Sequence, residues 1–150
     1  MAKVNFNFNL PVSGITADFE DINLYEAIDL VINNGGYGYF DRNGGYINGQ
    51  YYPHVLDYSI SHGGGTYNLE FGGNVNYSVN YNNYLGYEIT GGVVNHFRET
   101  VNDYNTGIYG VLDIQNASYD AKSVQEAAST SSSSDDRAIL KNILSGDDSI

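Results

Sequence analysis

The sequence predicts an α+β fold in which one curved antiparallel sheet, a meander, carries a few helices on one side. Alternating apolar residues, typical of half-buried strands, occupy the first ten positions and the stretch from Leu56 to Ile114. A helical pattern of apolar residues lies between Leu24 and Ile32. Of 150 residues, 18 are Gly and 15 are Tyr while only 16% are charged, a composition typical of β-rich domains with many turns.

Strands are predicted at the start and across the middle of the chain. Apolar residues alternate with polar ones from Val4 to Leu10, and Pro11 ends this strand because it cannot donate to a sheet. Between Leu56 and Ile114 the chain divides into strand-length units about 8–10 residues apart. We expect hairpin turns at Gly72-Gly73, Asn82-Asn83 and Gly91-Gly92.

Helices are predicted on either side of this meander. Asp21 is a suitable N-cap for the first helix, and Gly35 or Gly36 is expected to end it. Residues 1–120 then form one α+β globular domain. Residues 121–134 indicate a short helix and a Ser-rich hinge, and residues 135–150 a C-terminal amphipathic helix with a short tail.

A Tyr-, Gly- and Asn-rich segment, residues 35–55, is expected to form a long loop that offers a binding face. Tyrosines give rigid, amphipathic contacts at low entropic cost, as they do in binding loops generally. The alternative is that the same side chains pack the loop onto the sheet. The candidate ligand-binding residues are Tyr37, Tyr39, Phe40, Tyr46, Tyr51, Tyr52 and His54.

Charge and cysteine content exclude several classes of function. A net charge of −12 with only six Lys and Arg argues against nucleic acid and anionic membranes as partners. The absence of Cys excludes disulfides, thiolate nucleophiles and zinc–thiolate sites. No apolar run approaches the ~18 residues of a membrane span, and the first residues lack the layout of a cleaved signal peptide. A cysteine-free, acidic chain rich in Gly, Asn and Tyr fits an exported bacterial protein, so we expect an unknown extracellular ligand or a surface glycan as partner.

Catalytic motifs are absent from this sequence. "SHGGG" at residues 61–65 is similar to the oxyanion strip of lipases, but no G-x-S-x-G nucleophile segment accompanies it, so a turn is expected. "DRNGG" starts like a calcium loop at Asp41, but Tyr46 and Tyr52 occupy its Gly and Glu positions. We predict a protein that is not an enzyme; a hydrolase is the less favoured alternative.

The last residues carry a resemblance to a known family. "GDDSI" matches half of the calcium-binding nonapeptide G-x-D-x-U, where U is apolar. Together with "TGGVV" at residues 90–94 and "LSGDDSI" at residues 144–150, it resembles the region that precedes the repeats of RTX-type (hemolysin-type) calcium-binding proteins of bacteria.

This RTX resemblance implies a secreted, extracellular protein that uses type I secretion with an uncleaved signal. It implies that calcium is bound mainly by repeats beyond this chain. Within residues 135–150, Asp147 and Asp148 would be calcium ligands where the repeat region begins.

A second resemblance concerns residues 72–82, "GGNVNYSVNYN", and extends roughly over residues 20–120. They are similar to the secreted bacterial heme acquisition proteins (hemophores), in which a tyrosine ligates the heme iron. The resemblance implies a hemophore-like module with Tyr77 as the heme ligand. A core position is the alternative for Tyr77.

The hemophore pattern is incomplete in this chain. Asn33 stands where the family has a second, histidine ligand, and Tyr84 and Leu85 stand where a histidine assists the tyrosine. The sequence leaves open whether His54 or His62 replaces the lost histidine, because nothing in it places either residue near Tyr77.

Overall fold

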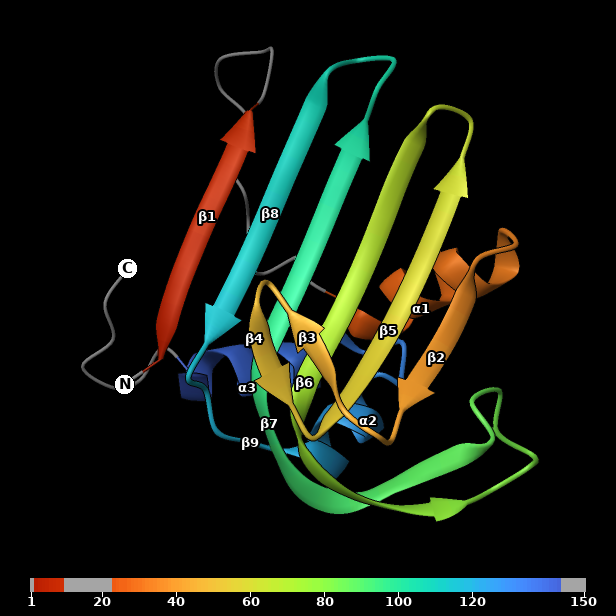
Figure 1. Ribbon diagram of the computed structural model, residues 1–150, viewed down its shortest axis with the longest axis vertical. Helices are drawn as coiled ribbons and strands as arrows, with labels where there is room; N and C mark the ends of the chain where they lie inside the picture. Colours follow the sequence, from red (N-terminus) through yellow and green to blue (C-terminus); the bar gives the residue numbers. More distant parts are fainter. Residues whose placement is uncertain (1, 10–22, 144–150) are drawn as a thin grey trace.

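The computed structural model of the chain describes residues 2–9 and 23–143 and confirms the α+β class. The main sheet is antiparallel with strand order β1-β8-β7-β6-β5-β2, β9 pairs with β7, and β3 and β4 form a separate hairpin. Three helices pack on one face of the sheet and the hairpin lies on the other (Figure 1). The elements are β1 Lys3–Asn9, α1 Leu24–Asn33, β2 Tyr37–Asp41, β3 Gly45–Ile47, β4 Gln50–Tyr52, β5 His54–His62, β6 Gly65–Val79, β7 Tyr87–Asp103, β8 Ile108–Gln115, β9 Tyr119–Asp120, α2 Ala121–Ala127 and α3 Ser133–Ile143.

Two neighbouring rows of side chains show how the pairing register separates core from surface. Because successive residues of a strand point to opposite faces, directly paired residues form rows across the sheet. One row belongs to the main hydrophobic core, which the helices cover. The next row faces the other way and is polar. The core row is Val4, Ile114, Phe97, Phe71, Leu56 and Phe40; the polar row is Asn5, Asp113, Arg98, Glu70, Asp57 and Tyr39.

The two longest strands differ from the expected short units. β6 has 15 residues and β7 has 17, because Gly72-Gly73 and Gly91-Gly92 do not form turns. The pairing register shifts at Gly72/Gly73 and at Asn76/Tyr77, so two irregularities interrupt one continuous strand pair. After the first irregularity, residues 74–93 bend away from the rest of the sheet (Figure 1). We call residues 74–93 the arm.

Residues 35–55 also differ from the expected loop, since most of them form β2, β3 and β4. The sequence contains the signal for this: Asn48-Gly49 is a two-residue hairpin turn, and both residues have positive φ, 48° and 80°. β2 pairs with β5 and becomes an edge of the main sheet.

The helices agree with the expected pattern and differ at their ends. Asn23 caps α1, accepting a hydrogen bond from the Glu26 backbone N–H at 3.1 Å, whereas Asp21 lies outside the described residues. Asp120 caps α2 in the same way. α3 starts at Ser133, so the Ser-rich hinge is shorter than expected. None of the helices in the described ranges is long and apolar enough to cross a membrane.

Asp136 of α3 gives the fold a pH dependence. It is 2% exposed, and its Oδ1 accepts a hydrogen bond from the Leu24 backbone N–H at the start of α1, at 3.4 Å. Burial, more than the nearby Asp135, raises the pKa of Asp136 from 3.8 to about 6. A raised carboxyl pKa means that the folded state binds more protons, so its contribution to stability is present below pH ~4 and is lost as pH rises to about 6.

Asp136→Asn is therefore expected to raise the midpoint of thermal unfolding at pH 7.5 by about 2–5 °C and to leave it nearly unchanged at pH 4. The amide oxygen still accepts the Leu24 N–H, so the change isolates the buried charge. Thermal melts by circular dichroism at the two pH values measure it, with the exposed Asp29→Asn as control. A gain of equal size at both pH values would contradict the assignment.

Candidate functional site

Four aromatic rings meet where the arm crosses β2 and β5. Tyr77 of β6 lies 5.1 Å from Phe40, 5.6 Å from His54 and 5.7 Å from Tyr87 between ring centroids, in edge-to-face arrangements. Phe40 also contacts Tyr87 and stacks on His54. We call Phe40, His54, Tyr77 and Tyr87 the aromatic cluster. Such edge-to-face pairs stabilise a cluster beyond the area that they bury.

The bent strand pair places Tyr77 in this cluster. The Val75 backbone N–H donates to Nδ1 of His54 at 3.2 Å, so the imidazole is joined directly to the strand that carries Tyr77. Because Nδ1 accepts this hydrogen bond, the proton of the neutral imidazole is on Nε2. Tyr77 keeps 36% of its surface exposed, so one side of the cluster is open to a ligand.

An apolar cavity of about 300 Å³ adjoins the cluster, between α1, α2, the sheet and the tip of the arm. Phe40, His54 and Tyr87 line it, and Tyr77 contacts all three of these rings. A concave apolar site with a few polar groups is the usual form of a small-molecule site, and this volume is at the lower end of the typical range. Further lining residues include Ile28, Ile32, Leu56, Tyr58, Val94 and Val124.

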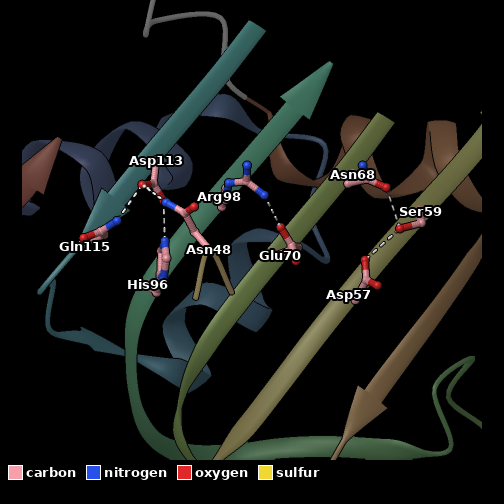
Figure 2. A network of polar contacts seen from close by, with 9 residues as sticks. All are labelled: Asn48, Asp57, Ser59, Asn68, Glu70, His96, Arg98, Asp113 and Gln115. Atoms are coloured by element: carbon pink, nitrogen blue, oxygen red, sulfur yellow. Dashed lines mark hydrogen bonds and ion pairs between the residues drawn. The ribbon is translucent and has the colours of Figure 1, made fainter. Parts of the chain in front are cut away.

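A polar network occupies the opposite face of the sheet (Figure 2). His96 is fully buried, and its Nε2 donates to Oδ1 of Asp113. The other oxygen of Asp113 accepts hydrogen bonds from Gln115 at 2.7 Å and from Asn48 at 3.2 Å. Since Asn48 is the turn of the β3–β4 hairpin, this carboxylate joins the hairpin to the sheet.

A small second core lies under the same hairpin. Ile47, Tyr52 and Val55 are buried together, and the Tyr52 ring packs against His96 at 5.3 Å between centroids. A Cβ atom on Gly72 would lie 2.6 Å from the Tyr52 ring, so glycine is what allows the hairpin to approach β6. Burial, and secondarily Asp113, raises the pKa of Tyr52.

The network continues across the polar face in pairs. Arg98 donates to Glu70 at 3.2 Å, and the Ser59 hydroxyl lies 2.9 Å from a carboxylate oxygen of Asp57. Burial raises the pKa values of Glu70 and Asp57, while their hydrogen-bond partners lower them. These side chains bind one another, and we assign them a structural role.

The residues of the expected binding loop are distributed over several places. His54 and Phe40 belong to the aromatic cluster, whereas Tyr52 is buried in the second core. Tyr46 and Tyr51 form an exposed pair on the hairpin, with ring centroids 5.4 Å apart. The remaining two, Tyr37 and Tyr39, are exposed on β2, and the calcium candidates Asp147 and Asp148 lie outside the described residues.

The residues that the hemophore resemblance singled out also lie in different places in the structure. Asn33 ends α1, and its side chain donates to Asp29 at 2.6 Å. Leu85 lines the cavity and Tyr84 is exposed at the tip of the arm. Of the two histidines left open by the sequence, His54 lies beside Tyr77. Within the described part of the chain, no group of three or more His, Asp or Glu side chains is placed to hold a metal ion.

The His96–Asp113 pair is expected to stabilise the hairpin. His96→Leu leaves Oδ1 of the buried Asp113 carboxylate without its hydrogen-bond partner, which costs about 3 kcal/mol of unfolding free energy. The double variant His96→Leu/Asp113→Leu removes that penalty and is expected to recover part of the loss. Urea denaturation measures both, with the exposed Asn76→Ala as control; a double variant less stable than His96→Leu would count against this role.

Comparison with known proteins assigns no family to this chain. No family model, no curated protein and no solved structure matches it. The residues of the aromatic cluster and the cavity beside it are therefore the basis for a functional proposal.

Proposed function

We propose that this chain is a non-catalytic domain that binds a flat, largely apolar ligand at the aromatic cluster, and that heme is the best candidate ligand. The observation that carries the proposal is the position of Tyr77. It is a partly exposed phenol in contact with three rings that line an apolar cavity. Aromatic faces, an adjacent apolar cavity and a single phenolic oxygen match a planar ring that carries a metal.

The residues present fit heme through Tyr77 and His54. Bound heme would supply an iron centre, and the Tyr77 oxygen would be the protein ligand that holds it, since tyrosine ligates heme iron in some proteins. His54 has its proton on Nε2, because Nδ1 accepts from the Val75 N–H. His54 would therefore serve as a hydrogen-bond donor beside the tyrosine ligand and not as an iron ligand itself. Partners of this kind orient a ligating group and tune its basicity.

Tyr77→Phe tests this function. We expect wild-type protein to shift the Soret band of added hemin and to give a phenolate-to-iron absorption band. Tyr77→Phe, which keeps the ring and removes the oxygen, is expected to lose that band and to bind hemin about tenfold more weakly. Tyr81→Phe is the matched control, since Tyr81 lies on the same arm and is 90% exposed. The proposal would be excluded if wild-type protein left the hemin spectrum unchanged. It would also be excluded if Tyr77→Phe protein changed that spectrum in the same way as wild-type protein.

A surface glycan is the second candidate ligand, and the exposed tyrosine pair favours it. Tyr46 and Tyr51 are 71% and 53% exposed, and they lie edge to face on the short β3–β4 hairpin. Exposed aromatic side chains of apolar body and polar tip suit contact with sugar rings at an aqueous surface. Tyr37 and Tyr39 add two more exposed rings on β2.

Tyr46→Ala/Tyr51→Ala is expected to abolish retention on an immobilised polysaccharide array, if glycan binding is the function. The two side chains are exposed, so we expect less than about 1 kcal/mol change in stability. Tyr52 is left intact because its removal would open the second core. The matched control is Tyr104→Ala, an exposed tyrosine on a different turn; equal retention of all three proteins, or of none, would contradict this candidate.

We further propose that the domain belongs to an RTX-type calcium-binding protein that is secreted to the extracellular space. The support is the resemblance of residues 90–94 and 144–150 and the acidic, cysteine-free composition. Calcium binding by Asp147 and Asp148 stays a prediction.

A further inference from the structure

We propose that Arg42 is a specificity-determining residue that binds a carboxylate on the ligand, so that the aromatic cluster takes flat aromatic carboxylic acids in preference to their uncharged analogues. This inference rests on the proposed function, because it describes the ligand of the same site. Arg42 would bind the ligand at the rim of the site, whereas Tyr77 would bind it at the centre.

Arg42 lies at the edge of the aromatic cluster. Arg42 directly follows β2, whose Phe40 is in the aromatic cluster, and its side chain is exposed. The guanidinium carbon lies 5.8 Å from the centroid of the Tyr87 ring, in a cation–π contact. Tyr87 in turn contacts Tyr77 at 5.7 Å between centroids. The contact therefore holds a positive charge at the edge of the cluster.

The N–H donors of Arg42 have no acidic partner among the described residues. Guanidinium presents five N–H donors in a planar fork that matches a carboxylate. Within residues 2–9 and 23–143, His96, Arg98 and Lys122 each have an acidic partner, and Arg42 has none. One oxygen of the neighbouring Asp41 carboxylate, Oδ1, accepts a hydrogen bond from the Asn43 N–H at 2.9 Å.

Positive charges are scarce in this strongly acidic chain. The chain carries 18 acidic residues and only six Lys and Arg, so most of its surface repels anions. An Arg without an acidic partner among the described residues, and placed on a cluster ring, offsets this repulsion at one point of the surface. A ligand whose flat part lies on the rings and whose carboxylate projects outward satisfies both features, since Arg binds carboxylates in a bidentate manner.

The experiment compares protoporphyrin IX with its dimethyl ester, and hemin with hemin dimethyl ester, under one set of solvent conditions. Porphyrin fluorescence gives the affinity of the metal-free pair, so the measurement does not depend on iron ligation. Wild-type protein is expected to bind each acid about fivefold more tightly than its ester, the value for one exposed charge-assisted contact of about 1 kcal/mol. Arg42→Gln is expected to remove this preference, so that acid and ester bind with equal affinity.

Lys3→Gln is the matched control, because it removes the same charge from β1, at the opposite edge of the sheet from β2. If wild-type protein binds acid and ester equally, or Lys3→Gln removes the preference as fully as Arg42→Gln, the role of Arg42 is overturned and ligand binding by the cluster stands. If wild-type protein binds neither acid nor ester, both this inference and the proposed function are overturned.

Discussion

The pairing register of the main sheet is the constraint on which both surfaces of this domain depend. It joins Val4, Ile114, Phe97 and their paired neighbours into one apolar row, and places the polar row from Asn5 to Tyr39 immediately beside it. A slip of one residue in any strand would move the side chains of that strand from one row to the other. The helices can cover one face, and hydrogen bonds can join side chains on the other, only because the alternation is kept across six strands.

Glycine at a few positions adapts this regular sheet to a ligand. Gly72 allows Tyr52 to pack over β6, and the neighbouring register shift at Gly73 begins the bend of the arm. Gly92 has a φ of 93°, and a Cβ there would lie 2.5 Å from the Asn74 carbonyl oxygen, so the opposite strand needs glycine as well. The same irregularities bring Tyr77 to His54 and leave a cavity between the arm and the helices.

Local pattern predicted the fold better than it predicted the site. Alternation identified β1 and the meander, and the helical spacing of apolar residues identified α1, because these signals lie within a few residues. A glycine pair can indicate either a turn or an irregularity inside a strand. The prediction of turns at Gly72-Gly73 and Gly91-Gly92 is wrong, because both pairs lie inside long strands. Tyr77 is a candidate site residue because of the hemophore resemblance. Its contacts with His54 and Tyr87 depend on which strands pair and where the register shifts, and no local sequence pattern encodes either.

The pairing of β1 with β8 has a consequence for how the chain folds. Val4 pairs with Ile114, so β1 is synthesised well before β8, the strand that pairs with it. Contacts between residues so far apart in sequence slow folding, because a long loop must close before they form. Until then the unpaired edge of β8 is open to other chains. Aggregation during folding is therefore expected to begin at this edge, and a high concentration of newly made chains should lower the folded yield more than the stability of the finished sheet suggests.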